Sequence, residues 1–215
     1  NFTIQLFGIN EKRETYSVLI ENFKPYFYVK IPNMWGENER RKFEQYINNR
    51  LGNMQIKESV LSRFKKLYGF DGGKKHNFIK LLFDNQITFN RVKSFWFRDG
   101  ILISGGIKFN KTLVELYEAQ IPPLLRFFHE NEISPSGWIS IDNEKSVLLD
   151  SVTKTTSCDY EIKTDYENIV ATTEDSHVPY KICSFDIEAS SSHGDFPLPV
   201  KSYKKLANEI LEFSQ

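Results

Sequence analysis

Alternating apolar and polar positions open the chain. Residues 1–9 (NFTIQLFGI) and 14–20 (ETYSVLI) both show this alternation, and the charged segment NEKR between them is typical of a turn. Residues 26–31 (YFYVKI) form a third short run that ends at Pro32. Side chains of a strand alternate between two faces, so a period of two indicates half-buried strands. This part of the chain therefore predicts three β-strands.

A helical period replaces the alternation over residues 37–52 (ENERRKFEQYINNRLG). The first turns are charged, and Phe43, Ile47 and Leu51 recur at every fourth position. Gly52 follows the last of these apolar residues and is a typical residue for ending a helix. This segment predicts an amphipathic helix.

The strand pattern returns on both sides of the loop DGGKK at residues 71–75. Residues 59–70 and 76–83 predict two strands around a tight reversal, and residues 86–97 are compatible with a second helix. The order β-β-β-α-β-β-α predicts an α+β fold, with an antiparallel or mixed sheet and helices packed on it.

The second half of the chain is less regular. Residues 112–131 become helical toward their end, with Pro122 and Pro123 at the helix start, and residues 137–141 (GWISI) predict a short strand. Residues 151–178 are polar and rich in Thr, and their weak alternation predicts an exposed β ribbon between two domains.

The last segment combines an apolar run with a helical pattern. Residues 180–189 (YKICSFDIEA) are typical of a central strand. Residues 200–215 then predict an amphipathic helix with Leu206, Ile210 and Phe213 on one face.

Composition narrows the class of protein. A length of 215 residues suits one large domain or two small ones. No window is apolar enough for a membrane span, and the two cysteines, Cys158 and Cys183, favour a reducing, intracellular setting over a disulfide framework. The chain starts without Met and inside an apparent strand, which suggests a fragment.

The net charge of zero hides an asymmetry between the two parts of the chain. Residues 1–150 hold 22 Lys and Arg against 17 Asp and Glu, whereas residues 151–215 hold 6 against 11. The split is compatible with a basic surface for a polyanion beside an acidic, metal-attracting site. Two ordinary solvated surfaces explain the charges equally well.

Two carboxylates end the apolar run. On a strand, Asp186 and Glu188 point to the same side, with Phe185 and Ile187 on the core side. Two such carboxylates could share Mg²⁺ or Mn²⁺, which prefer oxygen ligands, and two such ions support phosphodiester hydrolysis. From the spacing alone, an exposed acidic strand end is the commoner explanation.

The surroundings of these carboxylates resemble a known family. The segment SFDIEA, preceded by PYKIC and followed by SSSHGDFP, is similar to the first exonuclease motif of family B DNA polymerases. Residues 116–141 (LYEAQIPPLLRFFHENEISPSGWISI) and the segments FTIQLFGIN, KPYFYVKIP and KKLYGF resemble earlier parts of those polymerases, in the family's order. Within that family, the segments resemble the delta-like enzymes of large DNA viruses.

The resemblance implies a domain organisation. Residues 1–150 would form the N-terminal domain, with a core similar to an RNA-recognition fold, and residues 151–178 a β-ribbon linker. Residues 179–215 would supply the first strand and helix of a ribonuclease H-like 3′–5′ exonuclease domain, in which Asp186 and Glu188 are catalytic and bind metal. The family's later exonuclease motifs and its palm aspartates would lie outside this chain.

The resemblance also implies a function and partners. The parent would be a DNA-directed DNA polymerase that acts in replication and proofreads with two Mg²⁺ or Mn²⁺ ions. Its partners would be the DNA template-primer, deoxynucleotides and a sliding clamp. It would not bind a membrane. It would work in a virus factory in the host cytoplasm or in the host nucleus, and this fragment alone would be inactive.

A second set of residues suggests contact with nucleic acid. Lys65, Lys66, Lys74 and Lys75 surround one loop, and Tyr26 and Tyr28 share one strand face. Cations grip phosphates and aromatic rings stack on unpaired bases. Core packing and a soluble strand edge are the plain alternatives.

His193 adds one more candidate, because it could approach a substrate phosphate from the loop after Glu188. The rival to the polymerase interpretation is a non-catalytic module that binds single-stranded nucleic acid, in which both carboxylates are incidental.

Overall fold

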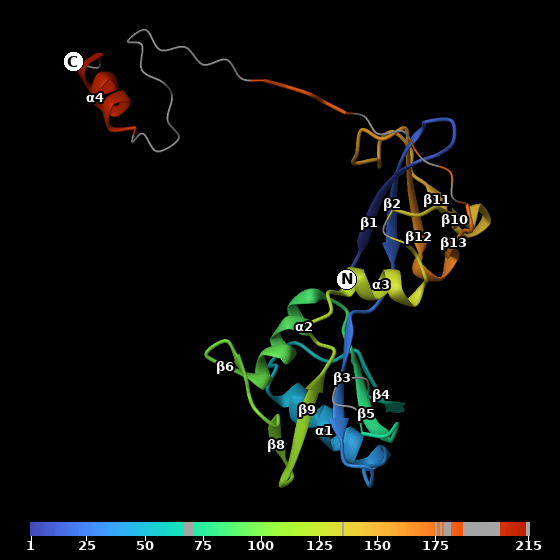
Figure 1. Ribbon diagram of the computed structural model, residues 1–215, viewed down its shortest axis with the longest axis vertical. Coiled ribbons are helices and arrows are strands. Elements are labelled where there is room, and N and C mark those ends of the chain that lie inside the picture. The colour runs from blue at the N-terminus through green and yellow to red at the C-terminus, as the bar shows by residue number, and fades with distance from the viewer. Residues whose placement is uncertain are drawn as a thin grey trace. The chain divides into compact units, whose positions relative to one another are not determined.

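The computed structural model describes residues 1–66, 71–134, 136–174, 176, 178, 182–186 and 203–213. The chain divides into two compact units, Asn1–Val178 and Pro179–Gln215, which are considered separately below (Figure 1). None of the helices within the described residues has the length and apolarity of a membrane span.

The first strands form a hairpin, as the alternation predicts. β1 (Ile4–Ile9) pairs antiparallel with β2 (Thr15–Glu21), so that Ile4 lies opposite Ile20. β12 (Tyr160–Asp165) adds to β2 in parallel, and β11 (Val147–Leu148) pairs with β12. The resulting sheet has the order β1-β2-β12-β11 and joins segments far apart in the sequence (Figure 1).

The prediction of an exposed ribbon at 151–178 is wrong for β12, because this strand lies between β2 and β11 inside the sheet. Its Glu161 side chain is completely buried and accepts hydrogen bonds from the backbone N–H and hydroxyl groups of both Thr155 and Thr156. The buried residues of this strand are Glu161 and Thr164, which are polar. A polar composition suggested an exposed strand, whereas the structure buries these side chains with their hydrogen-bonding groups satisfied.

A second, five-stranded sheet holds most of the remaining strands in the order β4-β5-β3-β9-β8, with antiparallel pairing throughout. Along the chain, its strands and the two helices packed on it follow the order strand-helix-strand-strand-helix-strand-strand. These elements are β3 (Tyr26–Ile31), α1 (Glu37–Asn49), β4 (Glu58–Lys65), β5 (Lys75–Leu82), α2 (Gln86–Lys93), β8 (Ile107–Phe109) and β9 (Thr112–Tyr117).

The sequence therefore predicts the first five strands and the first two helices correctly, but not their separation into two sheets. The shorter elements are the helical turns η1 (Ser94–Trp96), η2 (Asn143–Lys145) and η3 (Tyr166–Asn168), and the strands β6 (Phe97–Arg98), β7 (Ile101–Leu102), β10 (Ile139–Ile141) and β13 (Ile169–Ala171).

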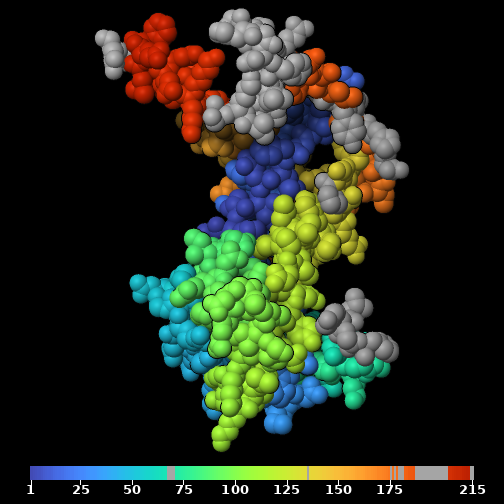
Figure 2. Space-filling model, turned by 60° about the vertical axis from the view of Figure 1, so that its left-hand side comes forward, coloured from blue at the N-terminus to red at the C-terminus, as the bar shows by residue number. Residues whose placement is uncertain are grey.

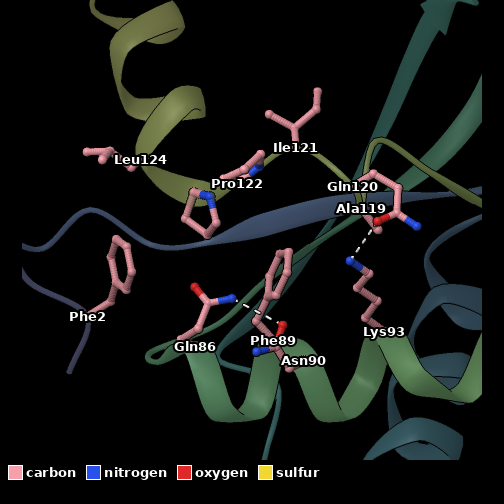
Figure 3. A pocket seen from close by; sticks show the side chains of 11 residues that line it. Phe2, Gln86, Phe89, Asn90, Lys93, Ala119, Gln120, Ile121, Pro122 and Leu124 are labelled. Carbon is pink, nitrogen blue, oxygen red and sulfur yellow. Dashed lines mark hydrogen bonds between the residues drawn. The ribbon is translucent and has the colours of Figure 1, made fainter. Parts of the chain in front are cut away.

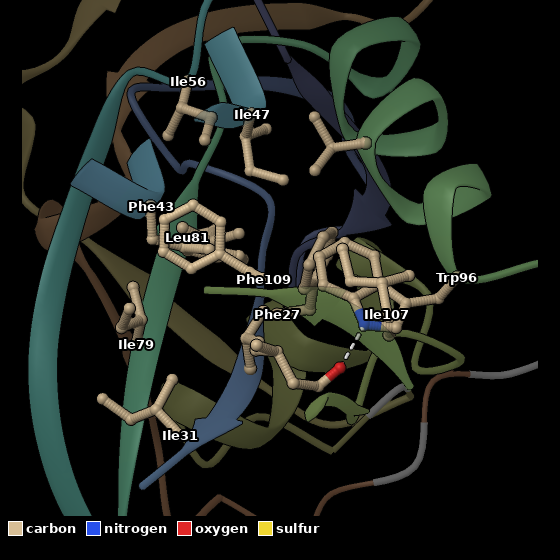
Figure 4. Close-up of a cluster of buried hydrophobic side chains, with 14 of the residues drawn as sticks. Phe27, Ile31, Phe43, Ile47, Ile56, Ile79, Leu81, Trp96, Ile107 and Phe109 are labelled. Carbon is tan, nitrogen blue, oxygen red and sulfur yellow. Dashed lines mark hydrogen bonds between the residues drawn. The ribbon is translucent and has the colours of Figure 1, made fainter. Parts of the chain in front are cut away.

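The larger core lies on one face of the five-stranded sheet. Phe27 and Val29 of β3 are fully buried, together with Phe43 and Ile47 of α1. Trp96 closes this core, and its ring N–H donates to the carbonyl oxygen of Val114 at 2.8 Å (Figure 4). The same core contains residues of α2, so α1 and α2 cover the same face of the sheet.

A smaller core lies beneath α3 (Pro123–Glu130), the helix that the two prolines predict. Phe127 of α3 packs edge-on against Phe23, with ring centroids 5.6 Å apart. The other buried members are Ile4, Val18, Ile20, Ile133 and Ile169. This cluster connects α3 to the first sheet.

In the second unit, α4 (Lys204–Phe213) is the predicted helix, and its Leu206, Ile210 and Phe213 side chains are exposed.

Glu161 provides a test of the β12 assignment through pH. Hydrogen bonds from Thr156 and then Thr155 lower the pKa of Glu161 below its ordinary value. A lowered folded-state pKa contributes stability above the unfolded-state pKa, of about 4.3, and this contribution is lost as the pH falls through the folded value. Glu161→Gln should therefore be less stable than the wild type at pH 7, as measured by urea unfolding.

The stability difference between Glu161→Gln and the wild type should shrink as the pH is lowered toward about 3. Glu174→Gln, in an exposed position, serves as the control. A difference that stays constant with pH would contradict the buried, ionised Glu161.

Candidate functional site

Of the two predicted metal ligands, the structure describes Asp186, whereas Glu188 and His193 lie outside the described residues. Residues 182–186 form neither helix nor strand, and they are exposed. Phe185, predicted to face a core, is 80% exposed. A central strand needs hydrogen-bonded neighbours, and no strand among the described residues pairs with this segment.

Carboxylate oxygens are suitable ligands for Mg²⁺ or Mn²⁺, so Asp186 fits such an ion chemically. A binding site needs several ligands, however. Within the described ranges no group of three or more His, Cys, Asp or Glu side chains is arranged to hold a metal.

Tyr26, a predicted nucleic-acid contact, is buried at the junction of β3 and α3. Its side chain is only 5% exposed, and its ring contacts Lys80 Nζ at 3.6 Å and the Arg126 guanidinium at 4.3 Å from the ring centroid. Its hydroxyl donates to the Glu130 carboxylate, and burial together with this hydrogen bond raises the pKa of Tyr26. In this structure the Tyr26 ring is occupied by protein contacts.

Arg126 is the centre of this junction. Its guanidinium donates to the carboxylate and to the backbone carbonyl of Glu118, each at 2.9 Å, and to the Tyr26 hydroxyl at 3.3 Å. Three separate acceptors and the Tyr26 ring thus fix α3 against the five-stranded sheet. We call Tyr26, Glu118, Arg126 and Glu130 the α3 clamp.

Tyr28 lies on the sheet face opposite the larger core. Its ring is 5.8 Å from that of Phe64 and 6.1 Å from that of Phe78, and Phe78 is 5.4 Å from Tyr117. Burial, followed by the nearby Glu118 carboxylate, raises the pKa of Tyr28. The face therefore carries an aromatic cluster that spans four strands.

The predicted basic residues lie at the tip of the β4–β5 hairpin. Lys65, Lys74 and Lys75 are exposed, whereas Lys66 is partly buried with its Nζ 3.7 Å from the Asp71 carboxylate. The Asp71 carboxylate also contacts His76 Nε2 at 2.5 Å, and this contact lowers the pKa of Asp71. The structure thus brings the four lysines together but keeps them away from Tyr26.

Among the pockets lined by described residues of the first unit, two are open to the surface. One, of about 410 Å³, lies between α2 and the start of α3, where Phe2, Phe89 and Pro122 form apolar walls beside Gln86 and Asn90 (Figure 3). In Figure 2 the residues from α2 to β9 form the green to yellow-green part of the surface.

The second pocket, of about 440 Å³, lies beside Tyr26 and Lys80 and has an acidic rim. The rim carries four carboxylates, those of Glu58, Glu130, Asp165 and Glu167, together with the ammonium group of Lys24. Burial lowers the pKa of Lys80 in this pocket.

Sequence reasoning missed the α3 clamp and most of the aromatic cluster. Arg126 and Glu118 are far from Tyr26 in the sequence, and nothing in the local pattern connects them. Phe64 and Phe78 could have been found, because they alternate along predicted strands with the same period as Tyr28.

Comparison with known proteins gives a consistent result. A family model described as DNA polymerase family B, exonuclease domain, matches residues 114–209, a range that includes Asp186 and Glu188. The chain is 45% identical over 223 aligned positions to the DNA polymerase of Phaeocystis pouchetii virus, covering 99% of this chain and 21% of the relative. It is 26% identical over 206 positions to the DNA polymerase delta catalytic subunit of Schizosaccharomyces pombe, covering 92% of this chain and 18% of the relative.

A solved structure agrees at the level of the fold. The family B DNA polymerase from the hyperthermophilic archaeon Pyrobaculum calidifontis matches with a TM-score of 0.55 and 13% identity, over 83% of this chain and 19% of the other. The chain thus spans about a fifth of the length of these proteins. The chain is similar to family B DNA polymerases, and the resemblance seen in the sequence is confirmed.

The α3 clamp predicts that Arg126 stabilises the fold. Arg126→Ala should lower the free energy of unfolding by about 2 kcal/mol, at the low end for a broken buried pair because the Glu118 side chain is half exposed. Urea denaturation measures this loss.

The control for this measurement is Lys145→Ala, which removes the more exposed pair with Asp142 and should cost less than about 1 kcal/mol. Equal losses for the two variants would show that the clamp does not hold α3.

Proposed function

We propose that this chain is part of a DNA-directed DNA polymerase that replicates DNA and removes mismatched 3′ nucleotides. The match of the exonuclease-domain model to residues 114–209 carries this proposal. The printed names of the viral and cellular relatives support it, since both are DNA polymerases. The relatives are about five times longer, so the activity is proposed for the whole protein.

The proposed domain organisation is an N-terminal domain at 1–150 and the start of a ribonuclease H-like exonuclease domain at 179–215. Residues 151–178 connect the two in sequence, although their strand β12 pairs with β2 of the first unit. The order β3-α1-β4-β5-α2-β9, in which β5 and β3 are inner strands of an antiparallel sheet and β8 is an added edge strand, supports an RNA-recognition-like core.

Asp186 and Glu188 are proposed as the first two metal-binding carboxylates of the exonuclease site. Bound Mg²⁺ or Mn²⁺ ions would activate water and stabilise the leaving oxygen of the scissile phosphodiester. The two carboxylates would supply hard oxygen ligands and set the spacing of the ions, and His193 would approach a substrate phosphate. Two carboxylates do not complete such a site, so the 215-residue chain alone is proposed to be inactive.

The proposed partners of the whole protein are a DNA template-primer, deoxynucleotides and a sliding clamp. The viral relative supports a role in replication inside an infected cell, in a cytoplasmic virus factory or in the nucleus.

A second candidate function is binding of single-stranded nucleic acid by the first unit. The observation that favours it is the group of four lysines, Lys65, Lys66, Lys74 and Lys75, at one hairpin tip. Lysines at such a tip would contact phosphates and make binding sensitive to salt. This function is independent of Asp186 and Glu188.

The exonuclease proposal is tested by Asp186→Ala and Glu188→Ala in the full-length protein. Each variant should lose nearly all Mg²⁺-dependent 3′–5′ digestion of single-stranded DNA while primer extension stays within about twofold, because the two activities use different carboxylates. Gel analysis of labelled primers measures both activities.

Glu174→Ala removes an exposed carboxylate of the same matched region and is the control. Wild-type digestion in the Asp186→Ala and Glu188→Ala proteins would refute the assignment. Digestion by the 215-residue chain that disappears in Asp186→Ala would refute the proposed inactivity of the chain.

A further inference from the structure

β4 is an edge strand of the five-stranded sheet. It pairs with β5 from Glu58 to Lys65, and no other strand among the described residues pairs with it (Figure 1). With 8 residues it is longer than β8, the 3-residue strand at the opposite edge. An unpaired edge of this length presents backbone N–H and C=O groups that can pair with a strand of another chain.

The beginning of this edge is already in contact with α1. The Arg40 guanidinium donates to the backbone carbonyl of Ser59 at 3.1 Å and to the Ser59 hydroxyl. Farther along the strand, Val60 is 40% exposed and Phe64 is 49% exposed. Both alternate with Ser59 and therefore point to the sheet face opposite the helices. The accessible part of the edge begins at Val60.

The charges on and beside β4 restrict which strand can pair with this edge. Arg63 and Lys65 are exposed cations of the strand, and Lys57 is an exposed cation directly before it. Residues directly opposite each other in a sheet lie on the same face, and like charges in this position destabilise the pair. A partner strand must therefore keep its own cations away from these three residues.

A second copy of β4 meets this condition in few registers. A two-fold axis must pass through a residue, because an axis between residues would bring the covered face of one sheet beside the uncovered face of the other. An axis at Val60 places Lys57 opposite Arg63, and an axis at Leu61 places Lys57 opposite Lys65. An axis at Arg63 places two Arg63 side chains opposite each other. These three registers are disfavoured.

An axis at Ser62 avoids every one of these contacts. In this register Arg63 lies opposite Leu61 of the second copy, and Lys65 lies opposite Ser59. Each cation therefore faces an uncharged side chain. Of the axes at residues 60 to 63, which pair most of the strand, the axis at Ser62 alone keeps like charges apart.

The Ser62 register also matches side chains on the face opposite the helices. Val60 lies opposite Phe64 of the second copy, and the symmetry repeats this pair, so both partly exposed apolar side chains gain an apolar neighbour. Glu58 lies opposite Lys66, the residue that follows the strand, so that opposite charges meet at both ends. The edge is thus complementary to itself in shape of pattern and in charge.

We propose that two copies of this chain associate through their β4 edges, antiparallel and with Ser62 of one copy directly opposite Ser62 of the other. The association joins two five-stranded sheets into one continuous sheet and covers the open edge of each. It does not involve Asp186 or Glu188, so it goes beyond the proposed exonuclease function and is tested separately from it.

Disulfide trapping tests the register. In a chain with Cys158→Ser and Cys183→Ser, Ser62→Cys should form a disulfide-linked dimer under mild oxidation. Cα atoms directly opposite in an antiparallel pair are about 4.5–5.5 Å apart, which is within the range of a disulfide. Non-reducing gel electrophoresis measures the yield, and mass spectrometry identifies the linked residues.

Lys65→Cys in the same background is the control for trapping. Residue 65 belongs to the same edge strand and is more exposed than Ser62, but in the proposed register its two copies are about 20 Å apart. Equal crosslinking of the two variants, or none of Ser62→Cys, would overturn the proposal. Association through another surface, such as the exposed apolar side chains of α4, would leave Ser62→Cys without a crosslink.

Sedimentation equilibrium of the uncrosslinked chain measures the dissociation constant of the dimer. Val60→Lys should weaken dimerisation about tenfold, because the symmetry removes the pair with Phe64 twice. Val147→Lys is the matched control and should dimerise like the wild type, since Val147 is 60% exposed on β11, the edge strand of the other sheet. A wild-type chain that is monomeric at about 100 μM, or equal weakening by the two substitutions, would contradict the proposal. Circular dichroism verifies the folding of each variant.

Discussion

One-sided packing of the five-stranded sheet is the constraint on which the first unit depends. The large side chains of α1 and α2 reach Phe27 and Val29 from the same side, and Trp96 closes that core through its hydrogen bond to Val114. Since strand side chains alternate, filling one face with apolar groups leaves Tyr28 and Phe64 on the other. The same alternation that builds the core therefore places an aromatic cluster on the opposite face.

The α3 clamp connects this sheet to the rest of the first unit. Arg126 reaches back to Glu118 and Tyr26, while Phe127 on the same helix enters the smaller core beside Phe23. The family match begins within β9 and continues through α3 and β12 to the segment that holds Asp186. Residues that shape the first unit and the proposed metal ligands thus lie in one homologous stretch.

Much of the fold follows from local pattern. The spacing of Phe43 and Ile47 predicts α1, and Pro122 with Pro123 predicts the start of α3. The parallel pairing of β12 with β2 does not follow, because these strands are distant in sequence and Glu161 is polar although buried. For the site, the motif around Asp186 led to the family that the comparisons support. The α3 clamp depends on contacts between residues distant in sequence, which no local signal reveals.

The most direct test of this account is a crystal structure of the full-length protein grown with Mn²⁺, in which the ions are located by their anomalous scattering. The account predicts Mn²⁺ bound by the carboxylates of Asp186 and Glu188. Mn²⁺ ions bound elsewhere, with no ion at either carboxylate, would contradict it.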